Sequence, residues 1–198
     1  QITVNHPLAS FFDELNAGSI HIVDLTHTLS PEFPTLVLPP EFGQVWPFKL
    51  ETICQYDQAG PGWYWNNFSC GEHTGTHFDA PIHFAEDGHH SEQVPLERLC
   101  GSAAVLDLTF VAPGGVVSEA DIVRAAVPAG GLHADDIVLL RFDYDGDPAN
   151  NRHFTAEAIA YLVATGVKLV CTDLLGIELP ADDPRLAEQH NHHHLMTA

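Results

Sequence analysis

The chain has 198 residues, of which 27 are acidic and only 7 are basic, so its formal net charge is −20. Such an acidic surface repels a phosphate backbone and anionic lipids, which argues against nucleic-acid and membrane partners. The length suits one domain over residues 1–198 with a substantial core, and no apolar run approaches membrane-spanning length.

The cysteine pattern indicates reduced thiols. Cys54, Cys70, Cys100 and Cys171 are widely scattered and form no C-x-x-C pair. No signal-peptide pattern is visible, so we expect a cytoplasmic protein. The chain begins at Gln1 rather than at a methionine, which leaves a removed leader open.

The first part of the chain predicts few regular elements. Residues 8–16 favour a short helix, and residues 20–25 read as a strand. Five prolines between positions 30 and 47 exclude regular structure over most of that stretch. A loop of this length in a compact domain is often a lid over a substrate, and anchoring of its aromatic residues to the core is the alternative. Residues 63–69 are a strong strand candidate.

The second half alternates strands and helices. Strands are predicted at 103–108, 137–142 and 167–172. A capping box that starts at Ser118 opens a helix to about Ala126. Thr155 caps a second helix that runs to Thr165 and stops at Gly166. This alternation predicts a layered α/β architecture.

The most informative stretch has the sequence HTGTHFDAPIH. His73, His77, Asp79 and His83 fall on alternate positions, so an extended segment would place them on one face. Neutral imidazole and carboxylate are the usual ligands of divalent cations. We therefore predict that His73, His77 and Asp79 hold a metal, with space for the ion and a water beside Gly75. Since 14 residues are histidines, simple hydrogen bonding within a polar loop is the alternative.

The same stretch resembles the H-x-G-T-H-x-D-x-P-x-H signature of the cyclase family of metal-dependent amide hydrolases. Val23–His27, followed by Pro31 and Pro34, resembles the opening segment of that family, and Gly101–Leu108 resembles its G-x-A-x-V-x-D strand. The resemblance runs from about Ile20 to Met196. It implies a swivelling β/β/α fold and a metal-activated water that attacks an amide.

The resemblance also implies roles for further residues. The ion would be Mn²⁺, with Zn²⁺ as the alternative, and His83 would be either a general base or acid or a ligand of a second metal. The family places an active-site histidine before a Leu-Leu pair. His192 or His193 matches it, with Leu195–Met196 in place of the leucines. The family's later active-site residue and final strand have no counterpart in this sequence.

The expected reaction is attack of metal-bound hydroxide on a cyclic aromatic amide. Trp63 and Trp65 suit a flat bicyclic substrate, which favours the opening of isatin to isatinate, and core packing is their alternative role. N-formylkynurenine is the alternative substrate. We also expect a homo-oligomer, a dimer.

Two other classes of function compete with this prediction. His77 and Asp79, joined by a distant histidine, imitate the ligand triad of a non-haem iron oxygenase, which leaves His73 and His83 unexplained. A closed coordination shell would instead make the chain a metal-binding protein without catalytic activity.

Overall fold

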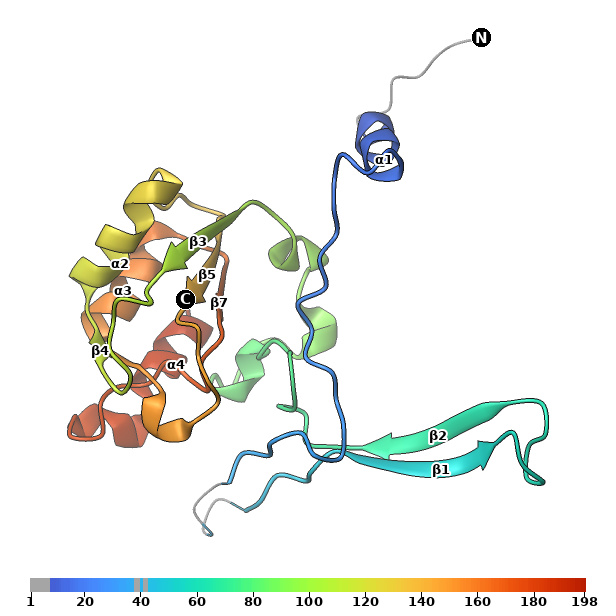
Figure 1. Ribbon diagram of the computed structural model, residues 1–198. Coiled ribbons are helices and arrows are strands. Elements are labelled where there is room, and N and C mark those ends of the chain that lie inside the picture. Colours follow the sequence, from blue (N-terminus) through green and yellow to red (C-terminus); the bar gives the residue numbers. More distant parts are fainter. Residues whose placement is uncertain (1–7, 38–39, 41–42) are drawn as a thin grey trace. The chain divides into compact units, whose positions relative to one another are not determined.

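A computed structural model describes residues 8–37, 40 and 43–198 of the chain (Figure 1). Positions 38–39 and 41–42, within the predicted proline-rich loop, lie outside the described residues. The chain divides after Phe78 into two compact units, and each is described by itself. None of the described helices is long and apolar enough to cross a membrane.

Among its described residues, the first unit contains one α-helix and one hairpin. Helix α1 (Ala9–Asn16) matches the predicted helix. Strand β1 (Lys49–Gln55) pairs antiparallel with β2 (Tyr64–Ser69), with an irregularity in the register between Thr52 and Cys54. The strand expected at 63–69 is therefore confirmed, whereas its partner β1 was not predicted.

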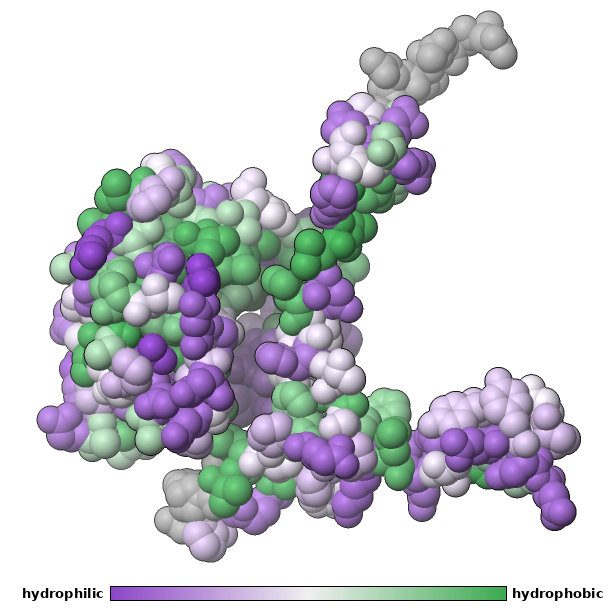
Figure 2. Space-filling model, viewed as in Figure 1, coloured by the Kyte–Doolittle hydropathy of each residue, from purple (hydrophilic) through white to green (hydrophobic). Residues whose placement is uncertain are grey.

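The strand predicted at residues 20–25 is wrong. This segment has no regular structure, and its side chains Ile22, Val23 and Leu25 are 79%, 71% and 74% exposed. Figure 2 shows hydrophobic residues along the segment that follows α1 in Figure 1. A strand needs a neighbour to satisfy its backbone hydrogen bonds, and in this unit β1 and β2 pair with each other.

The second unit is built on a parallel three-stranded sheet with the order β3-β5-β7. Its strands are β3 (Ala103–Asp107), β5 (Ile137–Arg141) and β7 (Leu169–Thr172). Helices α2 (Glu119–Ala126) and α3 (Ala156–Thr165) form the connections between them. These five elements lie where the sequence predicts them, so the α/β architecture is confirmed.

The core of this unit forms between the sheet and its helices. Ala104 and Leu106 are buried while their neighbours in β3 are exposed, because side chains alternate between the two faces of a strand. Leu106 joins Ile122 of α2 and Leu162 of α3, all fully buried, in one hydrophobic cluster. The sheet therefore packs against α2 and α3 through one face.

The helix ends follow the predicted capping chemistry. The Ser118 hydroxyl accepts a hydrogen bond from the Asp121 amide at 3.3 Å, and the Asp121 carboxylate accepts one from the Ser118 amide at 2.9 Å. The Thr155 hydroxyl accepts one from the Ala158 amide at 3.2 Å. Gly166 ends α3 with φ at +76°, a conformation that favours glycine.

The remaining elements are short. Strands β4 (Val116–Val117) and β6 (His153–Phe154) form a parallel pair, and helix α4 spans His190–Met196. Single 3₁₀ turns occupy Pro81–His83, Ser91–Gln93, Leu96–Leu99, Val127–Ala129, Pro148–Asn150 and Pro184–Glu188.

Candidate active site

The histidine-rich stretch forms a loop rather than a strand. Gly75 has φ at +72°, and Pro81–His83 forms a 3₁₀ turn that opens on a proline. A Cβ atom at position 75 would lie only 2.6 Å from Cδ2 of Leu29. The prediction of open space beside Gly75 is therefore wrong, because the Leu29 side chain lies there. Glycine is required there because of its left-handed conformation and because Leu29 packs against it.

His73 and His77 lie against each other in this loop. Nδ1 of His73 is 3.1 Å from Nε2 of His77, and Nδ1 of His77 is 2.8 Å from the Gly75 carbonyl oxygen. Because a carbonyl oxygen can only accept, the Nδ1 atom of His77 carries the proton. A neutral His77 therefore presents the lone pair of Nε2. Metal-binding histidines commonly donate their other ring N–H to a carbonyl in this way.

The nitrogen separation in this pair fits metal ligands. Two nitrogen ligands of a tetrahedral zinc ion, each bound at about 2.0–2.1 Å, lie roughly 3.3 Å apart. The observed 3.1 Å between the ring nitrogens of His73 and His77 is close to that spacing. An ion bound by these two nitrogens would replace the hydrogen bond between the rings, since each nitrogen would need its lone pair for the metal.

A second group of side chains in this loop includes the Asp79 carboxylate. One ligand atom from each of His73, Asp79 and His83 lies within 4.8 Å of the other two. His73 and Asp79 are half-buried, whereas His83 is exposed. The loop therefore gathers the imidazoles of His73 and His83 and the carboxylate of Asp79. The predicted ligand His77 contacts His73. His83 reaches this group through the turn at Pro81–His83 and not through strict alternation along a strand.

The predicted opening segment lies beside this loop. The backbone amide of His27 donates a hydrogen bond to the Thr76 hydroxyl at 3.0 Å. Asp24 accepts one from the Thr26 amide at 2.9 Å, and its hydrogen bonds with Thr26 lower the pKa of the Asp24 carboxyl. Two of the three sequence segments that carry the family resemblance are thus joined directly.

His83 is connected to α4 through an aromatic ring. The His83 and Phe84 rings lie 4.2 Å apart between centroids, and the Phe84 ring stacks on His192 at 4.7 Å with an interplanar angle of 29°. Phe84 therefore contacts the rings of both histidines. Residues 83 and 192, which lie near opposite ends of the second unit in sequence, are therefore linked through the Phe84 ring.

Glu178 fixes the orientation of His192. Its Oε2 atom lies 3.1 Å from Nδ1 of His192, and its Oε1 atom accepts a hydrogen bond from the Asn191 amide at 2.7 Å. Burial raises the pKa of Glu178, but the hydrogen bonds from His192 and Asn191 outweigh it and lower the pKa. The carboxylate is therefore ionised and accepts the Nδ1 proton of His192, whose Nε2 atom remains available.

Asn191 anchors the helix that carries His192. It is fully buried, and its side-chain amide donates to the carbonyl oxygens of Phe154 at 3.1 Å and Ile177 at 2.9 Å. Helix α4 has only seven residues, and Gln189 precedes it with φ at +50° and no side-chain cap. Such a short helix depends on tertiary contacts, and Asn191 supplies them.

The other predicted site residues lie elsewhere. Trp63 immediately precedes β2 and Trp65 lies within it, and the two side chains are 52% and 57% exposed. His193 is exposed on α4, and its backbone carbonyl accepts a hydrogen bond from the Thr197 hydroxyl at 2.8 Å. His193 also lines a shallow hollow beside residues 85–88.

Comparison with known proteins decides the family. The family model named Cyclase matches residues 23–179. The chain belongs to the Cyclase family. Isatin hydrolase of Roseibium aggregatum is 34% identical over 172 residues, and the match covers 76% of this chain and 65% of that protein. Kynurenine formamidase of Erythrobacter litoralis is 31% identical over 168 residues, with 83% of this chain and 68% of that protein covered.

A solved structure shows the same fold. Isatin hydrolase A of Ralstonia solanacearum superposes with a TM-score of 0.86 at 34% identity, over 99% of this chain and 83% of that one. The α/β fold of the Cyclase family is therefore confirmed. The chain spans slightly less than two thirds of the isatin hydrolase from Roseibium aggregatum.

Three residues that contact the candidate site, or that position His192, were not identified from the sequence. They are Phe84, Glu178 and Asn191. Phe84 directly follows the histidine-rich stretch, so its position beside His83 gave some signal. Glu178 lies in an irregular segment after β7, 14 residues before His192, and no sequence spacing links the two. Only the folded arrangement reveals that pair.

Proposed function

We propose that this Cyclase-family protein hydrolyses the amide bond of a cyclic aromatic substrate and opens isatin to isatinate. The observation that carries the proposal is the convergence of His73, Asp79 and His83 within 4.8 Å, inside the segment that matches the family. Similarity to an isatin hydrolase in sequence and to another in structure supports the substrate class.

The donor set fits a divalent ion. His73, His77 and Asp79 would hold it, because imidazole and carboxylate suit Mn²⁺ and Zn²⁺, and we favour Mn²⁺. When bound, such an ion lowers the pKa of a water and polarises a carbonyl group. The hydrogen bond from His77 to the Gly75 carbonyl holds that ring in the tautomer a ligand needs.

His83 is proposed as the general base. Its ring would accept a proton from the attacking water at a nitrogen atom and return it to the leaving amide nitrogen. The ring is exposed and lies against Phe84, so it is accessible to a substrate while one side is supported. Its place near His73 and Asp79 supports the alternative, a ligand role towards a second ion.

His192 is proposed as the second proton carrier, in preference to His193. It contacts Phe84 on one side and Glu178 on the other, whereas His193 is exposed beside Thr197. With Nδ1 held by Glu178, Nε2 of His192 can donate or accept a hydrogen bond towards the substrate. Glu178 acts here as a positioning residue.

Glu178→Gln tests this positioning role. We expect activity to fall by about 10–100-fold, the usual cost of losing a residue that orients a functional histidine. The metal content should stay at the wild-type value, because Glu178 is not among the proposed ligands. Steady-state kinetics and elemental analysis measure both quantities. Full activity in Glu178→Gln would contradict the assignment, and Glu188→Gln, an exposed carboxylate at the end of a 3₁₀ turn, serves as the control.

The same variant changes the pH dependence of stability. Because the pKa of Glu178 is lowered in the folded protein, its carboxylate stabilises the fold above the unfolded value of 4.5. That contribution is lost as the pH falls through the lowered folded pKa. Thermal unfolding at neutral pH should therefore show Glu178→Gln to be less stable than wild type, and the difference should narrow in strong acid.

Trp63 and Trp65 are proposed to contact the substrate ring. Both indoles are more than half exposed, so little core packing is at stake. Their double alanine variant is expected to raise KM and to keep the metal content. Core tryptophans would instead cost about 3–5 kcal/mol on truncation. Substrate titration and melting curves separate these outcomes, and an unchanged KM in a folded variant would reduce the pair to structural residues.

An anaerobic assay tests the function directly. Metal-reconstituted protein is mixed with isatin or with N-formylkynurenine, and ring opening or loss of the formyl group is followed. Turnover of isatin without oxygen supports the proposal, and preference for N-formylkynurenine favours the formamidase reaction of the Erythrobacter litoralis relative. A strict requirement for oxygen would indicate an iron oxygenase instead.

A homo-oligomer, most simply a dimer, remains part of the proposal. The exposed apolar side chains Ile22, Val23 and Leu25 support it, because runs of this kind usually contact another protein surface. Light scattering of the purified chain measures the mass that decides between monomer and dimer.

A further inference from the structure

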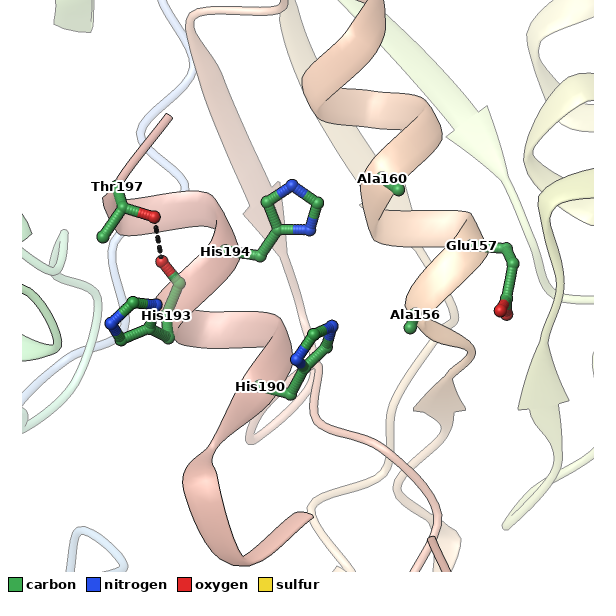
Figure 3. Close-up of a pocket in the computed structure, with 7 residues that line it drawn as sticks. All are labelled: Ala156, Glu157, Ala160, His190, His193, His194 and Thr197. Atoms are coloured by element: carbon green, nitrogen blue, oxygen red, sulfur yellow. Dashed lines mark hydrogen bonds between the residues drawn. The ribbon is translucent and has the colours of Figure 1, made fainter. Parts of the chain in front are cut away.

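A second pair of histidines lies on α4, apart from the residues proposed for hydrolysis. His190 and His194 are four residues apart, so one face of the helix carries both. Their ring centroids are 6.1 Å apart in an edge-to-face arrangement. Figure 3 shows both rings on the side of α4 that faces α3, with His193 on the other side.

Small side chains on α3 leave room beside this pair. Ala156 and Ala160, also four residues apart, line the same hollow as the two histidines. The hollow has a volume of about 390 Å³ and is open to solvent, and Glu157 also lines it. Two imidazole rings therefore border a space large enough for an ion and its waters.

The pair is separate from the proposed catalytic residues. At about 100° per residue, His192 lies on the opposite side of α4 from His190. Its ring contacts Phe84 and Glu178. His190 and His194 take no part in that arrangement.

We propose that His190 and His194 together bind one divalent transition-metal ion, such as Zn²⁺. Imidazole nitrogen suits Zn²⁺, Ni²⁺ and Cu²⁺, whereas Mg²⁺ and Ca²⁺ prefer oxygen ligands. The carboxylate of Glu157 points away from the two rings in Figure 3. Water therefore completes the coordination shell, and the site is weaker and more exchangeable than the three-ligand site.

The ion would also stabilise the helix. A ligand at each end of the His190–His194 turn ties together a seven-residue helix that lacks a side-chain cap. Binding to the folded state alone raises its stability by mass action. Helix α4 also carries His192 on its other side. Binding of the ion at His190 and His194 would therefore stabilise the helix that positions His192.

Zinc binding to the whole chain tests the proposal. After removal of metals with a chelator, the protein is titrated with ZnCl₂ and bound zinc is counted by calorimetry and equilibrium dialysis. His194→Ala should bind one zinc fewer than wild type, whatever number the wild type binds. Zinc should also raise the melting temperature of His194→Ala less than that of wild type.

His133→Ala is the matched control. His133 lies in a different loop of the same unit, with Nδ1 3.4 Å from the Asp136 carboxylate, and its removal deletes one histidine without touching α4. It should keep the wild-type zinc count. If His194→Ala fails to fold by circular dichroism, His190→Gln replaces it. An unchanged count in the folded variant, or an equal loss in His133→Ala, overturns the site. Neither readout depends on hydrolytic activity.

Discussion

Asp79→Asn is expected to abolish both metal binding and hydrolysis. The substitution keeps the shape of the side chain but removes the single negative charge among the proposed ligands. Without that charge, two neutral imidazoles hold a divalent ion much less firmly. Activity should fall by at least about 10²–10³-fold, because the lost ion would otherwise stabilise the developing oxyanion.

Elemental analysis and turnover of isatin measure this result together. Asp87→Asn is the matched control, because Asp87 is an exposed carboxylate in the turn that follows the same loop. That control should retain both metal and activity. A wild-type metal content in folded Asp79→Asn protein would remove Asp79 from the ligand set and with it the basis of the proposed hydrolysis.

His83→Ala should lower kcat by about 10²–10⁴-fold while the metal stays bound, if His83 is the general base. The acidic limb of the pH–rate profile should also disappear, because a neutral imidazole is needed to accept the proton. The structure makes this variant decisive, since His83 lies both against Phe84 and within 4.8 Å of His73 and Asp79.

The ligand role makes a different forecast for the same variant. If His83 binds a second ion, metal stoichiometry should fall from two to one, and added metal should restore part of the activity. His89→Ala, an exposed histidine six residues later, is the control for loss of an imidazole from this region. Full turnover by His83→Ala with its metal in place would rule out both roles.

The sequence alone determined most of the second unit and pointed to the proposed ligand residues. Strands β3, β5 and β7 and helices α2 and α3 were predictable because their signals are local. Such signals include buried apolar runs, the Ser118 capping box, the Thr155 cap and the left-handed stop at Gly166. These residues could be proposed because imidazole and carboxylate are donors that suit a divalent ion.

Tertiary structure decided the way these side chains come together. Alternation along a strand predicted one shared face, but Gly75 and the turn at Pro81–His83 produce the grouping instead. The apolar segment 20–25 forms no strand, because pairing depends on a neighbour that no local pattern specifies. Likewise, Glu178 meets His192 only because Asn191 fixes α4 against Phe154 and Ile177. Composition and spacing do not predict contacts between residues distant in sequence, because the packing of the whole fold determines them.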